Sequence, residues 1–374
     1  MAEVQGAEGH QASPKAQPDA KRQQLRNVRL LLILPFAATA VLLAPLGILR
    51  KSAEVDITLK VSRVSFKMGE QGSGLFRGLT TSALSLVSYQ EVNLGLGILE
   101  NATTIDPKSS TPSTWRQIGK RGETRIVSKD HFSSVTLQDV SINHLAIPPG
   151  SVATLSWLES EPNFLKLRVD GEGTAGTIVA GRQLLLSCSA CAASGVSSDG
   201  DFGSKFLRFA TDRRHVVSFR GRPEGITVAF ELRPGMKLVE QNVSVDGDVD
   251  FTQLEGRHRV STVISGEGKI TFEELGSKEV KIAAGDFLVV KDVKDFFLKT
   301  LQVEDGISIV LHGRAGRVHS GPPGFVKDRL PTILEFLYAS ETWAQWALYL
   351  NAVILIGTTS LAILKRLKIL REGE

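Results

Sequence analysis

The stretch Val55-Asp56-Ile57-Thr58-Leu59-Lys60-Val61-Ser62 alternates apolar and polar side chains at every position. This alternation is typical of a β-strand with one buried face, because successive residues of a strand point to opposite sides of the sheet. The pattern recurs along the chain at 135–140, 164–169, 225–232, 261–264, 269–272, 280–282, 287–290, 296–301 and 307–311. Short turns rich in Gly, Asp, Ser and Pro separate these runs, so we predict a mainly β domain of the sandwich or jelly-roll kind.

Two apolar runs lie on either side of this β-rich region. Residues 30–49 and 343–364 contain no charged side chain, and about twenty apolar residues suffice for a helix to cross a bilayer. We therefore predict transmembrane α-helices within 28–51 and 341–364. A signal peptide cleaved after Ala38-Thr39-Ala40 is the alternative for the first run, but that run is longer than the apolar part of a signal peptide.

The formal net charge of +4 is unevenly distributed along the chain. Basic residues cluster before the first apolar run and after the second, which places both termini in the cytoplasm by the positive-inside rule. Residues 52–340 contain 33 of the 44 basic and 34 of the 40 acidic residues and are close to neutral. The basic excess therefore reports membrane orientation, and no nucleic-acid partner is expected. We predict a two-pass protein of the bacterial inner membrane, with its central domain in the periplasm.

The chain divides into segments of different expected structure. In order, these are a disordered cytoplasmic tail at 1–27, the first span at 28–51, β-rich units at 52–148 and 149–328, an amphipathic juxtamembrane helix at 329–340, the second span at 341–364 and a cytoplasmic tail at 365–374. The β-rich region forms either these two units or a single one. The alternative for 329–340 is a helix that closes the core of the β-rich region.

Small and polar residues follow a helical spacing in both predicted spans. They are Ala37, Ala40, Ala44 and Gly47 in the first span, and Asn351 and Thr358 in the second. Small residues let helix backbones approach closely, and Asn or Thr can form hydrogen bonds across the contact. We expect these residues to pack the two helices together, within one subunit or between subunits. The alternative is that Asn351 and Thr358 line a pore.

The two cysteines form the pair Cys188-Ser189-Ala190-Cys191. A C-x-x-C pair acts as a redox dithiol when a helix N-terminus lowers the pKa of its first thiol. Here the pair follows the apolar run 183–186 and is expected to lead into a Gly/Ser-rich loop, so a local disulfide or a pair of buried thiols is favoured over a redox centre.

Three further groups of residues are candidates for binding. Arg213, Arg214, Arg220 and Arg222 surround a predicted strand and could bind anionic lipid headgroups or glycans, or could form a solvated strand edge. Asp246, Asp248 and Asp250 resemble part of a calcium loop but lack its distal Glu, which favours a turn between strands. His312 and His319 bracket a Gly/Arg-rich turn and are interpreted as solvated histidines, so no metal site is predicted.

No sequence motif identifies a reaction. The nucleophile elbow, the phosphate-binding loop and the dinucleotide fingerprint are all missing from the sequence, and no cofactor or catalytic residue is predicted. We predict a non-enzymatic membrane protein that contacts membrane lipids and whose periplasmic β-rich domain binds an envelope protein, lipid or glycan. The alternative is a homo-oligomeric two-span channel or membrane-permeabilising effector.

Overall fold

The computed structural model gives the coordinates of most of the central region. It describes residues 44–70, 76, 79–94, 103–105, 116–117, 124–130, 133–142, 145–171, 175–180, 183–189, 191–194, 196–197, 206–210, 215–232 and 242–339, together with the helical residues 343, 345, 347–349, 351–352, 355, 357–359 and 362–363. Contacts group the chain into two compact units. Lys51–Pro331 is one unit, hereafter the β domain, and residues 1–50 with 332–374 form the other.

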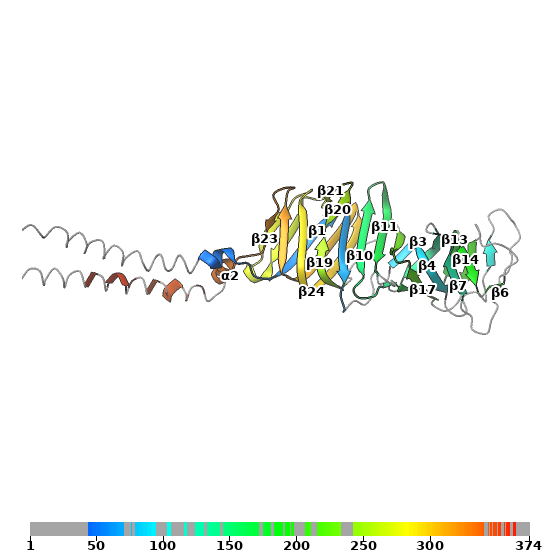
Figure 1. Cartoon of the computed structure of the whole chain (residues 1–374), viewed down its shortest axis with the longest axis horizontal. Helices are drawn as coiled ribbons and strands as arrows, with labels where there is room; N and C mark the ends of the chain where they lie inside the picture. The colour runs from blue at the N-terminus through cyan, green and yellow to red at the C-terminus, as the bar shows by residue number, and fades with distance from the viewer. Residues whose placement is uncertain are drawn as a thin grey trace, which may run out of the picture. The chain divides into compact units, whose positions relative to one another are not determined.

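The β domain is built from antiparallel strands, and its largest sheet contains 17 described strands (Figure 1). Hydrogen bonds join fifteen of them in the order β23 (Lys278–Ile282), β22 (Gly268–Phe272), β1 (Ala53–Val61), β25 (Gly306–Ala315), β24 (Phe287–Glu304), β19 (Val243–Asp250), β2 (Arg63–Met68), β10 (Val152–Leu158), β11 (Glu161–Asp170), β18 (Ile226–Leu232), β3 (Leu79–Val87), β8 (Ser134–Ile142), β13 (Gln183–Ser189), β16 (Phe206–Ala210) and β5 (Thr103–Ile105). The first part of β24 also pairs with β26 (Arg317–Gly321), which pairs with β27 (Lys327–Asp328). The prediction of a mainly β domain is confirmed.

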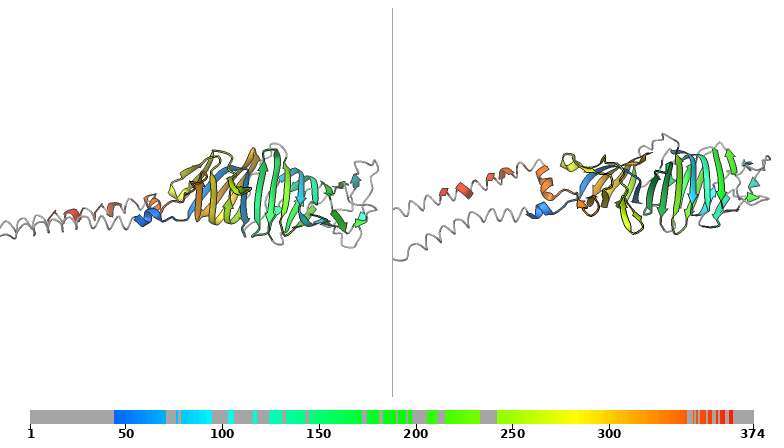
Figure 2. Two further views of the ribbon diagram at one scale, coloured as in Figure 1. Left: turned by 45° about the horizontal axis from the view of Figure 1, so that its top comes forward. Right: turned by 90° about the horizontal axis from the view of Figure 1, so that it is seen from above.

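A second sheet has six described strands, and two short two-stranded pairs complete the described strands. The six strands are β14 (Cys191–Ser194), β7 (Thr124–Ser128), β4 (Tyr89–Leu94), β17 (His215–Gly221), β12 (Ala175–Ala180) and β9 (Leu145–Ala146). The short pairs are β15 (Val196–Ser197) with β6 (Arg116–Gln117), and β20 (Thr252–Glu255) with β21 (His258–Ser261). Figure 2 shows the succession of strands from two further sides.

The alternation of β1 produces its buried face directly. Val55, Ile57, Leu59 and Val61 are buried, and the polar residues between them are half-exposed. Burial of one aliphatic side chain contributes about 1.5–3 kcal/mol relative to exposure. The same rule applies to β18, where every second residue from Ile226 to Leu232 is buried. A hydrophobic core of this kind holds the sheet in one register, because a shift by one residue would expose every buried side chain.

The strands β1 and β2 together close a ring in the sheet. They are separated only by Ser62, whose N–H donates to Thr262 O at 2.8 Å and whose carbonyl accepts from Trp157 N at 2.8 Å. On one side of Ser62, β1 pairs with β25, and on the other side β2 pairs with β19. Since β25 and β19 both pair with β24, hydrogen bonds run around a closed path. The strand β2 also pairs with β10, so the sheet continues across the predicted boundary at 148/149.

The two ends of the β domain lie next to each other. Lys51 N donates to Pro331 O at 3.4 Å, although these residues are separated by nearly the whole domain in sequence. In the other unit, α2 (Ile333–Ala339) falls within the predicted segment 329–340. A capping box opens α2, because Glu335 N donates to Thr332 Oγ1 at 3.2 Å and Thr332 N donates to Glu335 Oε2 at 2.8 Å. No residue of α2 is buried.

The predicted membrane spans fall largely outside the described residues. Only residues 44–49 of the first apolar run are described, and the second run is described in part. Within the described part of the chain, no helix combines the length and the apolar character that crossing a bilayer requires. The two transmembrane helices therefore remain predictions from the sequence.

Candidate functional site

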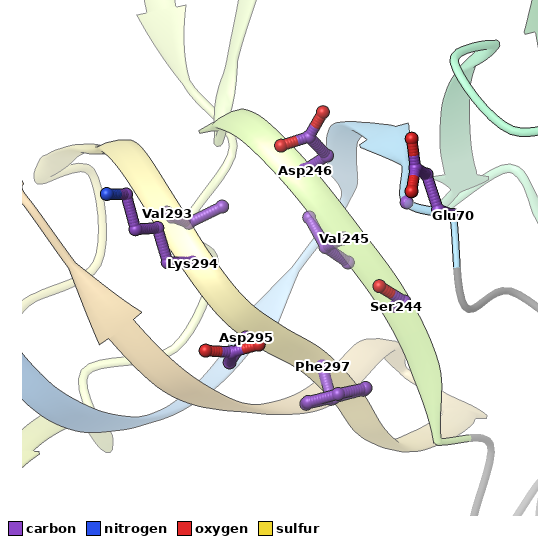
Figure 3. A pocket seen from close by; sticks show the side chains of 9 residues that line it. Glu70, Ser244, Val245, Asp246, Val293, Lys294, Asp295 and Phe297 are labelled. Carbon is purple, nitrogen blue, oxygen red and sulfur yellow. The ribbon is translucent and has the colours of Figure 1, made fainter.

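An open groove of about 430 Å³ lies along two neighbouring strands, β19 and β24, where β2 ends (Figure 3). Val245 and Val293 are buried beneath it, and Phe297 is half-exposed. The described residues of the lining are Gly69, Glu70, Ser244, Val245, Asp246, Val293, Lys294, Asp295 and Phe297. The groove thus combines an apolar base with charged side chains at its margin.

Irregular pairing between β19 and β24 shapes this groove. Val245 pairs with Phe296 and Gly247 pairs with Val293, so β24 carries one residue more than β19 over this interval. This is a β-bulge, which changes the direction in which nearby side chains point and is common beside binding sites. Asp295 adopts a φ of 48°, in the left-handed region that few residues other than Gly occupy. The bulge therefore interrupts the alternation of apolar and polar residues along β24 and places consecutive polar side chains beside the groove.

Charged side chains of both signs surround the groove, and acidic residues predominate in its described lining. Among the described lining residues, Glu70, Asp246 and Asp295 are acidic and Lys294 is basic. Asp246 Oδ2 lies 3.4 Å from Lys67 Nζ in an exposed ion pair. Exposed pairs of this kind contribute about 0–1 kcal/mol and leave both partners available to other ligands. The described lining itself therefore suits a ligand that combines an apolar part with positive charge.

The outer face beside the groove continues across the sheet in a row of directly paired residues. Ser244 of β19 pairs with Phe297 of β24, and Phe297 pairs with His312 of β25. His312 pairs with Asp56 of β1, which pairs with Thr271 of β22. Directly paired residues of antiparallel strands point to the same side of a sheet, and all five are half-exposed. The groove and His312 thus occupy one continuous face.

The predicted cysteine pair is divided between two sheets. Cys188 lies in β13 and is in register with Val135, whereas Cys191 opens β14 and is in register with Ser128. The expectation of a loop after the pair is wrong, because β14 begins at Cys191. The two side chains lie outside the described residues. The choice between a disulfide, buried thiols and a redox dithiol therefore stays a prediction.

The predicted arginine cluster is only partly described. Arg213 and Arg214 lie outside the described residues, and Arg220 is exposed in β17. The guanidinium of Arg222 is engaged within the β domain, where Nη2 donates to Ser128 Oγ and to Asp130 O, both at 2.7 Å. Its Nε also donates to the carbonyl of Tyr89 at 3.3 Å, so Arg222 links three separate segments. Binding of an anion or lipid by the cluster stays a prediction.

The aspartates of the calcium-like stretch lie on a strand. The expected turn between strands is wrong, because Asp246, Asp248 and Asp250 all belong to β19. Each is paired with a different cation: Asp246 with Lys67 at 3.4 Å, Asp248 with Lys291 at 3.8 Å and Asp250 with Arg259 at 3.0 Å. Their carboxylates therefore serve three separate ion pairs.

The residues of the predicted span stripes are mostly exposed or undescribed. Ala37 and Ala40 lie outside the described residues, while Ala44, Gly47, Asn351 and Thr358 are exposed. The hydroxyl of Thr358 donates to Leu355 O of its own helix at 3.0 Å. A role for these residues in helix packing or in a pore stays a prediction.

Comparison of the chain with protein-family models, with curated proteins and with solved structures gives no match. The groove was missed by reasoning from the sequence. The one signal that could have revealed it is the acidic pair Asp292 and Asp295, which interrupts the alternation between 287–290 and 296–301. The sequence pattern predicts that a strand ends at this interruption, whereas β24 continues through it.

Proposed function

We propose that this chain is a non-enzymatic, two-span membrane protein of the bacterial envelope, and that its periplasmic β domain binds a partner at the groove between β19 and β24. The groove is the observation that carries the proposal, because it joins an apolar base to a charged margin on an open face. Binding sites for other molecules commonly combine these two features.

The ends of the β domain support the proposed topology. Lys51 and Pro331 lie side by side, so the chain can enter the domain from one membrane helix and leave it into the other without a long connection. The basic residues beyond the two apolar runs favour cytoplasmic termini. We also propose a sandwich-like arrangement within the domain, because β12 of the six-stranded sheet lies against β8 of the larger sheet.

The chemistry of the groove favours one class of envelope partner, a protein segment that carries basic and apolar side chains. The described lining carries three carboxylates and one ammonium group, which favours a positively charged ligand, although the ammonium groups of Lys67 and Lys299 lie beside Asp246 and Phe297. Phe297 provides half-exposed aromatic surface beside the carboxylates, and aromatic residues are enriched where binding energy is concentrated. The acyl chain of a lipid would not use the carboxylates, and a neutral glycan would not use their charge.

The proposal is tested by capture of crosslinked partners from native membranes with the full-length chain. Glu70→Gln and Asp295→Asn remove two groove carboxylates while preserving side-chain size, and Asn tolerates the positive φ at position 295. We expect the double variant to lose the captured envelope protein. Glu267→Gln, in an exposed turn away from the groove lining, is the matched control and should retain it. Equal capture by all three proteins would refute binding at the groove.

A further inference from the structure

The outer face of the β domain carries a second group of side chains, centred on His312. Asp56 is the direct cross-strand partner of His312, and Asp56 Oδ1 lies 2.8 Å from His312 Nδ1. Glu273 begins the short 3-10 helix η1 (Glu273–Leu275) directly after β22, and its Oε1 lies 3.8 Å from the same nitrogen. Three elements distant in sequence thus direct a nitrogen and two oxygens to one point.

From this convergence we propose that His312 Nδ1, Asp56 and Glu273 form a binding site for a divalent transition-metal ion of the Zn²⁺ class. One atom from each residue lies within 4.8 Å of the other two. Ligand atoms held about 2.1 Å from a metal ion are separated by about 3.0–3.4 Å in tetrahedral or octahedral geometry. Small side-chain rotations bring the observed separations into this range, so the strands need not move.

The set of donor atoms decides the class of ion. An imidazole nitrogen with two carboxylates suits Zn²⁺, Mn²⁺ or Fe²⁺, whereas Ca²⁺ and Mg²⁺ prefer oxygen ligands alone. Imidazole is what distinguishes this site from a group of surface carboxylates. Three protein ligands leave coordination positions for water or for a group supplied by a partner.

Glu54 supplies the outer support that metal-bound histidines usually have. Its Oε1 lies 3.4 Å from His312 Nε2, on the ring nitrogen opposite the proposed ion. A carboxylate that accepts the Nε2–H fixes the ring orientation and leaves the Nδ1 lone pair directed at the metal. Glu54 also precedes Asp56 by two residues in β1, so both carboxylates point to the same face of the sheet as His312.

The electrostatics of the site favour a bound cation. Asp56 Oδ1 and Glu273 Oε1 lie 2.8 Å and 3.8 Å from His312 Nδ1, so two carboxylates converge on one ring nitrogen. Glu54, a third carboxylate, approaches the other side of the imidazole. A divalent ion would offset this concentration of negative charge. His312 is 29% and Asp56 36% exposed, so an ion can reach the site from solvent.

The test is metal binding by the full-length, detergent-solubilised protein after treatment with a chelator. We expect Zn²⁺ titration at neutral pH, followed by calorimetry and metal analysis, to give one bound ion per chain. His312→Gln and Asp56→Asn should abolish stoichiometric binding, and Glu54→Gln should weaken it about tenfold or more. His258→Gln, which removes an exposed histidine from β21, is the matched control and should bind like the parent protein.

Two outcomes would overturn the metal site. One is the absence of stoichiometric Zn²⁺ binding by the parent protein. The other is unchanged Zn²⁺ binding by both single variants, His312→Gln and Asp56→Asn. That result would place the bound ion elsewhere, for example at the cysteines. Circular dichroism of each variant shows whether the β domain is intact. If His312→Gln does not fold, Asp56→Asn provides the test, because asparagine has nearly the same shape as aspartate. The result does not depend on the groove partner, because metal binding is measured without it.

Discussion

Gly313→Ala is the substitution that most sharply probes how the groove face is built. Gly313 follows His312 in β25 and has a φ of 145°. A Cβ atom at this position would meet the backbone of the β24 bulge, at 2.6 Å from Phe296 Cα and in still closer contact with the carbonyl oxygen of Asp295. The bulge that shapes the groove therefore requires a residue without a side chain on the neighbouring strand.

Two terms set the size of the effect. A non-glycine residue at this φ costs about 1–3 kcal/mol in backbone strain, and forcing a methyl group against packed backbone costs about 1–3 kcal/mol more. We therefore expect Gly313→Ala to lower the free energy of unfolding by about 4 kcal/mol. Gly256 also has a positive φ, of 61°, but no described atom lies within 4 Å of the place that an alanine Cβ would occupy, so Gly256→Ala should cost only about 1–2 kcal/mol.

The assay is urea unfolding of the detergent-solubilised full-length chain, followed by circular dichroism in the β region. Gly266→Ala serves as the neutral reference, because Gly266 has no positive φ and no described atom within 4 Å. We expect Gly266→Ala to lie within about 0.5 kcal/mol of the parent protein. A loss for Gly313→Ala no larger than that for Gly256→Ala would refute the close packing of β25 against the bulge.

Three further predictions concern other parts of the chain. Arg222→Ala should destabilise the β domain by about 2–3 kcal/mol, because it removes three charged hydrogen bonds to two other segments, whereas Arg220→Ala should stay within about 0.5 kcal/mol in the same denaturation assay. Burial raises the pKa of the Tyr89 phenol far above its ordinary value, so the folded state keeps a proton that the unfolded chain loses near pH 10. The contribution of Tyr89 to stability is therefore complete below about pH 10 and falls by about 1.4 kcal/mol per pH unit above it, and Tyr89→Phe should remove this part of the alkaline slope. Asn351→Leu should leave liposome leakage and conductance unchanged if the second span only packs against another helix, and a loss of conductance would favour the channel alternative.

The β class of the domain could be predicted because apolar and polar residues alternate wherever a strand pairs regularly. In β1 and β18 every second residue is buried, as the sequence pattern indicates. The stretch 75–99 could not be assigned, although it contains β3 and β4. The reason is a bulge: Ala83 pairs with Glu231 and Thr81 pairs with Leu232, which leaves Ser82 as an extra residue. One extra residue reverses the alternation, so the period-two signal cancels over the strand.

The candidate sites could not be predicted, because their residues meet only through long-range strand pairing. Asp56 and His312 are 256 residues apart and become neighbours when β1 pairs with β25. Each occupies an ordinary polar position of an alternating strand. The local sequence around one of them therefore does not indicate that the other lies beside it. His319 instead lies on β26 and pairs with Val289 and Asp328, so the two histidines that bracket the Gly/Arg-rich turn are not in one site.

We propose that the groove face contacts a protein partner in the envelope. The most direct measurement is site-specific photo-crosslinking in native membranes, with the photoreactive residue placed at Lys294 in the groove or at Glu267 in the control turn. The proposal predicts a discrete crosslinked protein from position 294 that disappears in the Glu70→Gln/Asp295→Asn background and is not formed from position 267. Crosslinks of equal yield from both positions, or none from position 294, would contradict it.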